Sequence, residues 1–284
     1  AGLAELEEDP DTVQEAVVGD MLLMLQLTKM LPSLAKGMGA EVYAARLHEH
    51  MTPLLRYAAA WRPADLRHMV LAAIGDLASP LGVHIAAFAP QIAEAVHREL
   101  SPAQPALNKQ NACHACGQLC EHAGPSGAPL AAAVAAGALP LLIQSADEAP
   151  AVVDNACAAL ARIIHFQAAA IAAMPQHAYV TLLLGAFPLK EDMPETYAVM
   201  RALLGILSVS IGGEGVTGTP EMAPLLTQIR EAWKRGMDPN VYPGGAHPVV
   251  RQCTQQALDD VMRHWVSTGD ATRAHNLRDT LHSS

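Results

Sequence analysis

Apolar residues recur at helical spacing along most of this chain, and the pattern is clearest in segment 152–193. Its apolar positions step by three, four, three and one, which places them on one side of a helix: Val153, Ala156, Leu160, Ile163 and Ile164. A second amphipathic run follows and ends near Phe187-Pro188, because proline lacks the N–H that a helix interior requires. The segment is therefore predicted to be a helical hairpin, which can bury its apolar face only against similar neighbours.

Similar runs recur at a spacing typical of helical repeats. The pentapeptide AIGDL at 73–77 resembles ACGQL at 115–119, an offset of 42 residues (115 minus 73), and NAC at 111–113 recurs at 155–157, an offset of 44 (155 minus 111). HEAT-type repeats are about 40–47 residues long, so both offsets fit them. Four runs also carry a proline followed by apolar residues, which in a HEAT unit kinks the first helix: Pro53, Pro90, Pro140 and Pro224.

These patterns predict an all-α fold, an α-solenoid of HEAT-type helical hairpins. We expect an acidic lead-in over residues 1–11, an array of about six hairpin units over 12–270 with the first unit incomplete, and a tail or capping helix over 271–284. The predicted helices are 12–37, 41–60, 64–78, 84–100, 107–122, 128–145, 150–166, 168–187, 194–210, 221–235 and 248–266.

Composition indicates which kind of core the chain forms and which kind of partner it binds. Hydrophobic residues make up 51% of the chain and aromatic residues only 4%, which suits closely packed helices and not a β-sandwich. The formal charge of −10 argues against a nucleic-acid-binding face and favours basic partners. The longest apolar run, 128–143, is interrupted by Gly137 and Pro140, so we expect no contact with a membrane.

A cluster of cysteines is the strongest candidate for metal chemistry. Cys113, Cys116 and Cys120 lie beside two histidines, yet their steps of three and four place all three thiols on one helix face, the one assigned to the core. Zinc sites usually add a distant second pair of ligands, and no second Cys-x-x-Cys exists. We therefore predict buried structural thiols, without metal or cofactor. Because catalytic motifs are also missing from the sequence, we expect no enzyme.

Carboxylate and amide side chains are better placed to bind a partner. The second helices of stacked hairpins line the concave side of a solenoid, where acidic groups can receive lysine. The candidate cargo-binding residues are Asp154, Asn155, Asn111, Glu191, Asp192, Glu195 and Asp259. For Asn111 and Asn155, which share one repeat position, a structural ladder between neighbouring repeats is an equally good interpretation.

Two segments carry a resemblance to a known family. The helix Asp154-Asn155-Ala156-Cys157 with Ala159-Leu160-Ala161-Arg162, followed by Leu182-Leu183-Leu184 and Pro188-Leu189-Lys190-Glu191-Asp192, resembles the C-terminal region of importin-β-family nuclear transport receptors, in particular the importin-4 type. The segment Gln118-Leu119-Cys120-Glu121-His122 looks like the end of that family's preceding repeat. The similarity extends from about Asn108 to Leu207.

This resemblance implies a receptor that shuttles between cytoplasm and nucleus. Such receptors carry basic cargo, for example histones and ribosomal proteins, bind nucleoporins, and are unloaded by the GTP-bound form of Ran, whose main binding repeats lie in the N-terminal half of the full-length receptor. An alternative from a different class is a HEAT-repeat scaffold or adaptor, which holds other folded proteins together.

Overall fold

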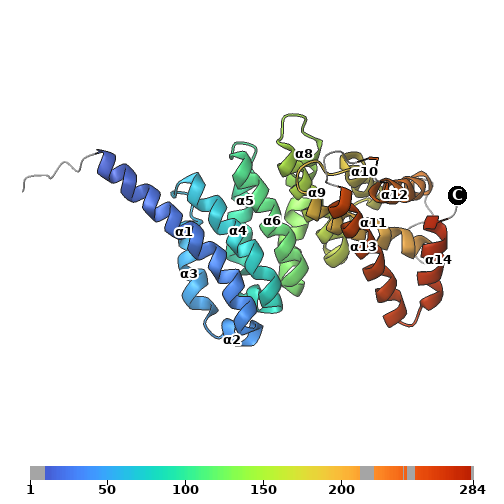
Figure 1. The fold of residues 1–284 in the computed structure, drawn as a ribbon, viewed down its shortest axis with the longest axis horizontal. Coiled ribbons are helices and arrows are strands. Elements are labelled where there is room, and N and C mark those ends of the chain that lie inside the picture. The colour runs from blue at the N-terminus through green and yellow to red at the C-terminus, as the bar shows by residue number, and fades with distance from the viewer. Residues whose placement is uncertain (1–9, 212–220, 239, 242–246, 283–284) are drawn as a thin grey trace, which may run out of the picture.

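The described chain is helical throughout. The computed structural model describes residues 10–211, 221–238, 240–241 and 247–282, and these contain α-helices and short 3-10 helices but no strand (Figure 1). The first half contains α1 Pro10–Met38, α2 Ala40–Ala44, α3 Leu47–Tyr57, α4 Ala64–Leu81, η1 Gly82–Phe88, α5 Ala89–Glu99, α6 Ala106–His122 and η2 Gly124–Gly127. The second half contains α7 Ala128–Ala135, α8 Ala138–Gln144, α9 Pro150–Phe166, η3 Ala168–Ile171, α10 Gln176–Ala186, η4 Met193–Glu195, α11 Thr196–Ile211, α12 Met222–Met237, α13 His247–Ser267 and α14 Ala271–His282.

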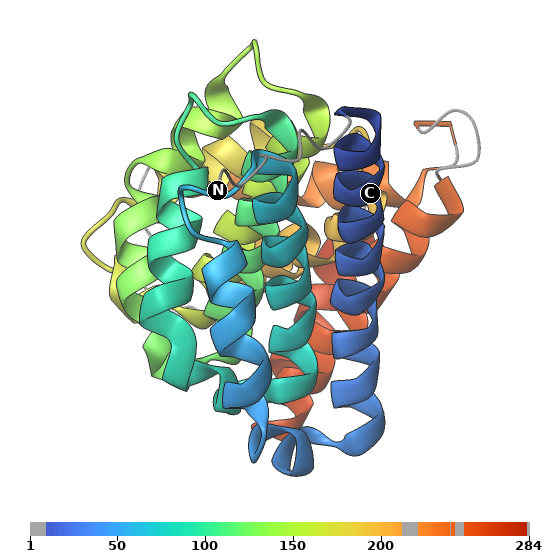
Figure 2. The same ribbon diagram turned by 90° about the vertical axis from the view of Figure 1, so that its left-hand side faces the viewer.

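Six of these helices form the spine of the molecule. α1, α4, α6, α9, α11 and α13, here called the stacked helices, pack each against the next in chain order. The remaining helices cover this row, and the result is an elongated solenoid with α1 at one end and α14 at the other (Figure 1). Figure 2 looks along the solenoid from the α1 end. The predicted all-α solenoid is confirmed.

The repeat unit contains three helical segments and not two. Each of α4, α6 and α9 is preceded by two shorter segments, namely α2 with α3, η1 with α5, and α7 with α8. The single helices predicted over 41–60, 84–100 and 128–145 are therefore wrong in one respect, because each is broken into two segments. In the last of them the break falls at Gly137, whose missing side chain weakens a helix interior.

The prolines play a different part from the one predicted. Of the four prolines predicted to kink a helix, Pro53 alone lies in a helix interior, that of α3. Pro90, Pro140 and Pro224 lie in the first turn of α5, α8 and α12. A backbone N–H has no helical partner in the first turn, so proline is tolerated there and starts the helix without kinking it.

Glycines mark equivalent positions of the repeats more consistently than the prolines do. Gly75 on α4 and Gly117 on α6 are the pair matched at an offset of 42, and a Cβ on either would lie about 3 Å from backbone atoms of the next stacked helix. Gly39, Gly82 and Gly124 all have positive φ, at 82°, 54° and 57°, and each follows the end of a stacked helix. A residue in this conformation ends a helix at little cost only when it is glycine.

Helix α4 belongs to the apolar core. By length and mean hydropathy alone, the stretch Ala64–Glu99 also qualifies as a membrane-spanning helix, although half of its most apolar window is buried inside the protein. Leu71, Ile74 and Leu77 of α4 are almost completely buried. Burial of this kind is typical of a core helix in a folded protein, which can pass the same test of length and hydropathy.

The predicted ends of the array fall partly within the described chain. Of the acidic lead-in, residues 1–9 lie outside the described residues, while Pro10 and Asp11 already belong to α1. Residues 212–220, which follow α11, also lie outside them. The stretch 271–284, expected to be a tail or a capping helix, contains α14.

Candidate functional site

Asp154, on α9, is the most deeply placed of the predicted binding residues. Its side chain belongs to a residue only 1% exposed, and Oδ2 accepts the backbone N–H groups of Lys190, Glu191 and Asp192 at 2.9, 2.7 and 2.9 Å. Three successive amides directed at one carboxylate oxygen form a nest for an anion. Asp154 therefore anchors the chain's own segment before α11, and the expectation that it binds cargo is corrected by this burial.

The two residues next predicted for cargo are held by the same segment. Asn155 is buried and donates from Nδ2 to the backbone oxygen of Ala151 and to Oδ2 of Asp192, at 2.9 and 3.0 Å. Glu195 is 9% exposed, lies on η4 and not within a longer helix, and accepts from Nη1 of Arg162 at 2.7 Å. Burial and these contacts hold both side chains inside the protein, so Asn155 and Glu195 are structural.

Asn111 forms the contact between neighbouring repeats that the structural interpretation predicts, and Asn155 does so less clearly. Its Nδ2 donates to the backbone oxygen of His68 on α4 at 3.0 Å and lies 3.2 Å from Nδ1 of the same histidine. Asn111 thus bonds to the preceding repeat, whereas Asn155 bonds to the segment that follows. The shared position is real, but the two amides have different partners.

Three of the predicted residues remain open to solvent to some degree. Glu191 and Asp259 are exposed, and Asp192 is half-buried. Asp259 accepts from Nε2 of Gln255 on the same helix at 2.9 Å, an exposed contact of small energetic weight. Glu191 and Asp259 are therefore the predicted carboxylates that a partner can reach.

A row of charged side chains crosses the stacked helices. His114 on α6 pairs through Nε2 with Asp76 on α4 at 2.9 Å, and its Nδ1 is 4.0 Å from Glu195. Arg162 on α9 then joins Glu195 to Glu121, at 2.7 and 3.0 Å, and Arg201 on α11 lies 3.6 Å from Glu121. Because the charges alternate in sign, this row is largely compensated and does not form a single acidic surface.

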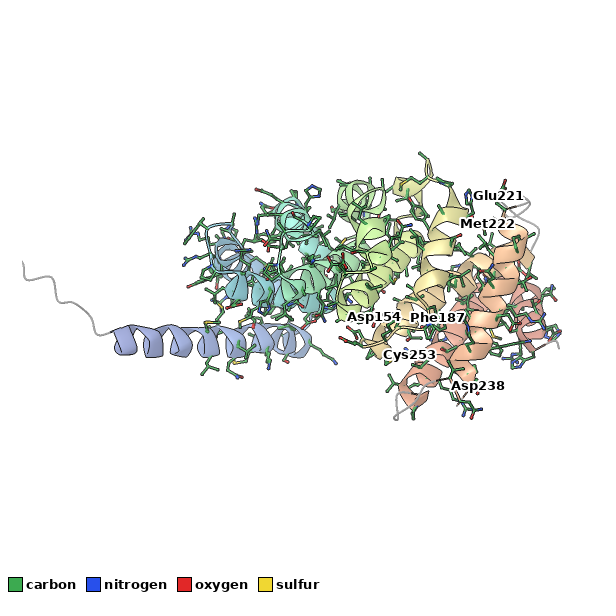
Figure 3. All side chains as sticks on the ribbon, turned by 90° about the horizontal axis from the view of Figure 1, so that it is seen from above. Asp154, Phe187, Glu221, Met222, Asp238 and Cys253 are labelled. Carbon is green, nitrogen blue, oxygen red and sulfur yellow. The ribbon has the colours of Figure 1, made fainter. Side chains whose placement is uncertain are left out.

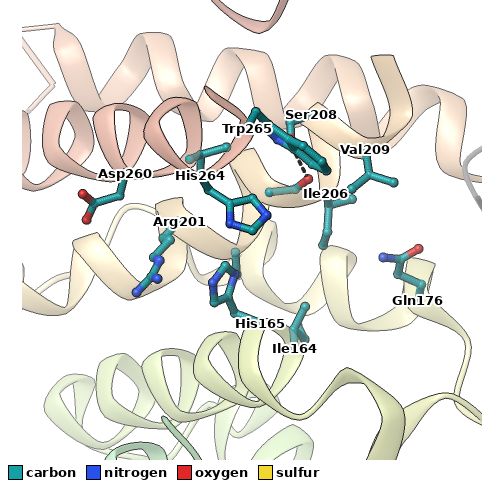
Figure 4. Close-up of a pocket in the computed structure, with 13 residues that line it drawn as sticks. Ile164, His165, Gln176, Arg201, Ile206, Ser208, Val209, Asp260, His264 and Trp265 are labelled. Carbon is teal, nitrogen blue, oxygen red and sulfur yellow. Dashed lines mark hydrogen bonds between the residues drawn. The ribbon is translucent and has the colours of Figure 1, made fainter. Parts of the chain in front are cut away.

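A groove opens where this row reaches the last stacked helices. It has a volume of about 390 Å³ and lies between α9, α11 and α13, beside the start of α10 (Figure 4). Its walls are mostly apolar: Ile164, Ala202, Ile206, Val209, Val261 and Trp265. The indole of Trp265 is fixed by its N–H, which donates to Oγ of Ser208 at 2.9 Å.

The polar side chains of the groove include two histidines. The rings of His165 and His264 point toward each other across it, and Arg201 and Asp260 lie to one side (Figure 4). Loss of hydration, helped by the neighbouring side chains of Arg201 and His264, lowers the pKa of His165 to about 4. The imidazole is therefore neutral at pH 7 and can form hydrogen bonds without repelling a cation.

Asp260 and Arg201 are already engaged at the groove's edge. The hydroxyl of Tyr197 donates to Oδ2 of Asp260 at 2.5 Å, and burial together with this bond raises the pKa of Tyr197 to about 12. The guanidinium of Arg201 stacks over the ring of Phe166, 4.9 Å from its centroid. Such contacts hold the groove's polar edge in place before any ligand arrives.

The thiols behave as their spacing predicts. Cys113, Cys116, Cys120 and also Cys157 are buried and free, and burial raises the pKa of Cys157 to about 12. The predicted buried thiols are confirmed. Within the part of the chain that the structure describes, no group of three or more histidine, cysteine, aspartate or glutamate side chains could hold a metal ion.

Reasoning from the sequence did not find the groove. Its lining comes from four separate helices, and the residues that give it character, His165, Arg201, His264 and Trp265, carry no motif. The adjacent aromatic pairs His165-Phe166 and His264-Trp265, both at helical positions, are the only signal that sequence offered, and histidine next to an aromatic residue is too common to use.

Comparison with known proteins supports the fold and no narrower class. No family model and no curated protein sequence matches the chain. Among solved structures it is similar to a designed armadillo repeat protein, with a TM-score of 0.53 and 17% identity over 84% of this chain and 98% of the designed one. The chain is an armadillo-like helical solenoid. This similarity does not distinguish an importin from any other protein of that fold.

Proposed function

We propose that this chain is a protein-binding adaptor, which holds an extended segment of another polypeptide along the stacked helices. The groove between α9, α11 and α13 carries this proposal, because it is an apolar hollow of about 390 Å³ with polar groups on one edge. A ligand pocket of this kind accepts an apolar side chain, and the polar groups fix the backbone beside it. One leucine or isoleucine of the partner fills the space between Ile206, Val261 and Trp265.

The chemistry of the rest of the partner follows from charge. The chain has a formal charge of −10, and exposed carboxylates lie at Glu191, shortly before η4, and at Asp259 on α13, one of the helices that form the groove. His165 adds no positive charge at pH 7, since its pKa is lowered. A segment with lysines on either side of one apolar residue therefore suits this surface, through weak and salt-sensitive attraction.

Nuclear import of basic cargo is the narrower form of the proposal and rests on the resemblance between residues 108 and 207. The acidic balance agrees with it. The residues that carry the resemblance hold one another, however, because Asp154 on one segment binds the backbone of residues 190–192 on the other. That motif therefore supports the shape of the solenoid, and the cargo chemistry must come from the exposed carboxylates and the groove.

The test measures binding of a lysine-rich peptide with a single leucine, by fluorescence anisotropy at two salt concentrations. Gly205 lines the groove, and a Cβ there would meet only Nδ1 of His165 at 3.9 Å, so Gly205→Leu fills the hollow without disturbing the backbone. Gly185→Leu, at an exposed position with nothing within 4 Å, is the matched control. We expect Gly205→Leu to weaken binding about tenfold or more, the worth of one buried leucine side chain.

Two further changes separate a groove contact from general attraction. Replacing the peptide's leucine by alanine should cost the wild-type protein as much affinity as Gly205→Leu does, and should cost that variant little. Glu191→Lys with Asp259→Lys should weaken a lysine-rich peptide but leave a neutral one unaffected. No binding at low salt, or equal binding by Gly205→Leu and the control, refutes the adaptor proposal.

A further inference from the structure

A second apolar hollow adjoins the groove between α9, α11 and α13. This second hollow has a volume of about 510 Å³ and lies beside η3 and the start of α10. Ile164 and Gln176 line both the groove and the second hollow, so these two side chains form the boundary between the two spaces. Together the groove and the second hollow make one longer depression, which extends from α13 past Ile164 to η3.

The walls of the second hollow suit an apolar side chain. Its floor consists of Ile171 and Tyr179, which are 6% and 4% exposed, and of half-buried Met174. The hydroxyl of Tyr179 donates to Sδ of Met174, so its proton is used within the floor. Among the described residues that line the hollow, no side chain is charged. A lysine would lose hydration there without compensation, whereas a leucine would gain from burial.

The start of α10, which borders the second hollow, is held in place before a partner arrives. Tyr179 and Val180, near the start of the helix, are buried against the core. Phe187, directly after the far end of α10, is 4% exposed and lies within the body of the protein (Figure 3). Its ring lies 5.9 Å from the guanidinium of Arg235 on α12. A hollow with fixed walls needs little ordering when a ligand binds.

Gln176 offers a free amide at the boundary between the two spaces. It is the first residue of α10, is half-buried, and projects toward the groove (Figure 4). Within the described part of the chain, its side chain has no hydrogen-bond partner. A primary amide both donates and accepts hydrogen bonds, so it can bind the N–H or the C=O of a peptide backbone that passes over the boundary.

We infer that the partner segment places two apolar side chains, separated by one residue, in the groove and in the second hollow, with Gln176 bound to the backbone between them. This inference rests on the proposed function, in which an extended segment occupies the groove. Alternate side chains of an extended segment point to the same face, about 7 Å apart. That is the shortest spacing on one face, and it suits two spaces that only two side chains separate. The residue between the anchors points to solvent and can be lysine.

The test compares three lysine-rich peptides by fluorescence anisotropy at low salt. The first contains leucine-lysine-leucine, the second leucine-lysine-alanine, and the third leucine-leucine-lysine, which has the composition of the first. We expect the first peptide to bind about tenfold or more tightly than either of the others, because each of those can bury only one leucine side chain.

Two variants locate the effect on the protein. Ala172→Phe fills the second hollow from its exposed rim, and Ala169→Phe, at an exposed position that does not line the hollow, is the matched control. We expect the first two peptides to bind Ala172→Phe equally and to keep their difference in the control. Gln176→Ala should weaken the first peptide about threefold or more, the worth of one hydrogen bond, while His177→Ala, at an exposed neighbour, should not.

The failure of this inference is distinguishable from that of the adaptor proposal. Equal binding of the first two peptides by the wild-type protein overturns the second anchor, and if Gly205→Leu still weakens both peptides, the adaptor proposal stands without it. A difference between the first two peptides that survives in Ala172→Phe overturns the second anchor as well. If none of the three peptides binds at low salt, both proposals are refuted.

Discussion

Arg162 and Glu195 form a buried ion pair that connects α9 to the segment before α11. Nη1 of the arginine lies 2.7 Å from Oε2 of the glutamate, and each residue is only 9% exposed. The same guanidinium donates from Nε to Glu121 on α6 at 3.0 Å. One cation thus holds two carboxylates from two different repeats.

Arg162→Met should therefore destabilise the protein strongly. The substitution removes the cation that Glu195 and Glu121 share, and breaking a buried pair costs about 3–5 kcal/mol. Urea unfolding followed by circular dichroism measures the change. Arg46→Met is the control, since Arg46 and Glu49 are an exposed pair three residues apart at the start of α3, and such a pair contributes at most about 1 kcal/mol. Similar losses in the two variants would contradict the structural role of Arg162.

Glu99 gives a prediction about pH. The residue is completely buried between Arg67, Arg98 and Asn108, and Arg67 binds it through both Nε and Nη2, at 2.8 and 3.1 Å. Burial acts to raise the pKa of this carboxyl, but the hydrogen bonds from its three partners outweigh it and lower the pKa below 4.5. The folded protein therefore holds the ionised form more firmly than the unfolded chain does.

The sign of the pH effect follows. The stabilisation by Glu99 is fully present above the ordinary pKa of about 4.5 and is lost as pH falls through the lower pKa of the folded state. We expect the urea midpoint of the wild type to fall in acid, and Glu99→Gln to be less stable at pH 7 with a shallower fall. Glu94→Gln, exposed on the same helix, serves as control and should follow the wild type. Parallel curves for wild type and Glu99→Gln would refute this.

Periodicity predicted where the helices lie far better than which side chains meet. The prediction for 150–166 matches α9 at both ends, because Pro150 starts the helix and its apolar positions follow helical spacing without a break. The offset of 42 residues correctly matched Gly75 with Gly117, whose close contacts need the same small residue in both repeats. Repetition in sequence is thus sufficient to give the solenoid.

Contacts between repeats were not predictable in the same way. The fourth residue of α4, Arg67, pairs with Glu99, and the fourth residue of α6, Lys109, pairs with Glu148, so both stacked helices bind a glutamate from the next unit. Helix α9 differs, because the residue that contacts the following segment is acidic: the carboxylate of Asp154 accepts hydrogen bonds from backbone amides. The sequence therefore predicts Asp154 to be free for cargo, because the segment 190–192 that donates hydrogen bonds to it has no counterpart in the other repeats.

Asp154→Ala tests whether this carboxylate stabilises the segment before α11. It removes one acceptor shared by three backbone N–H groups, and the loss of charge-assisted hydrogen bonds with their donors left buried should cost about 2–4 kcal/mol. Asp154→Asn keeps the shape and should recover part of that loss. Hydrogen exchange at the amides of 190–192 provides the local readout and should accelerate in the alanine variant. Unchanged exchange there would show that the nest contributes nothing.

The cysteines give a prediction that needs no substitution. Burial raises the pKa of Cys113 and Cys157, and a hydrogen bond with Cys120, followed by burial, raises the pKa of Cys116. Since only the thiolate reacts readily, these thiols should resist alkylation in the native protein. Cys253 is half-buried and lies 3.6 Å from the backbone oxygen of Pro194, so it should react first, though slowly.

Mass spectrometry after brief treatment with iodoacetamide counts the modified thiols. We expect one label, on Cys253, in native buffer at pH 8, and five in denaturant, because unfolding exposes every cysteine of the chain. Adding a zinc chelator should leave the native count at one, since the four buried thiols are protected by packing and not by a metal. Rapid native labelling of Cys113 or Cys116, or labelling that appears only after chelation, would show that the cluster is a reactive or metal-binding site.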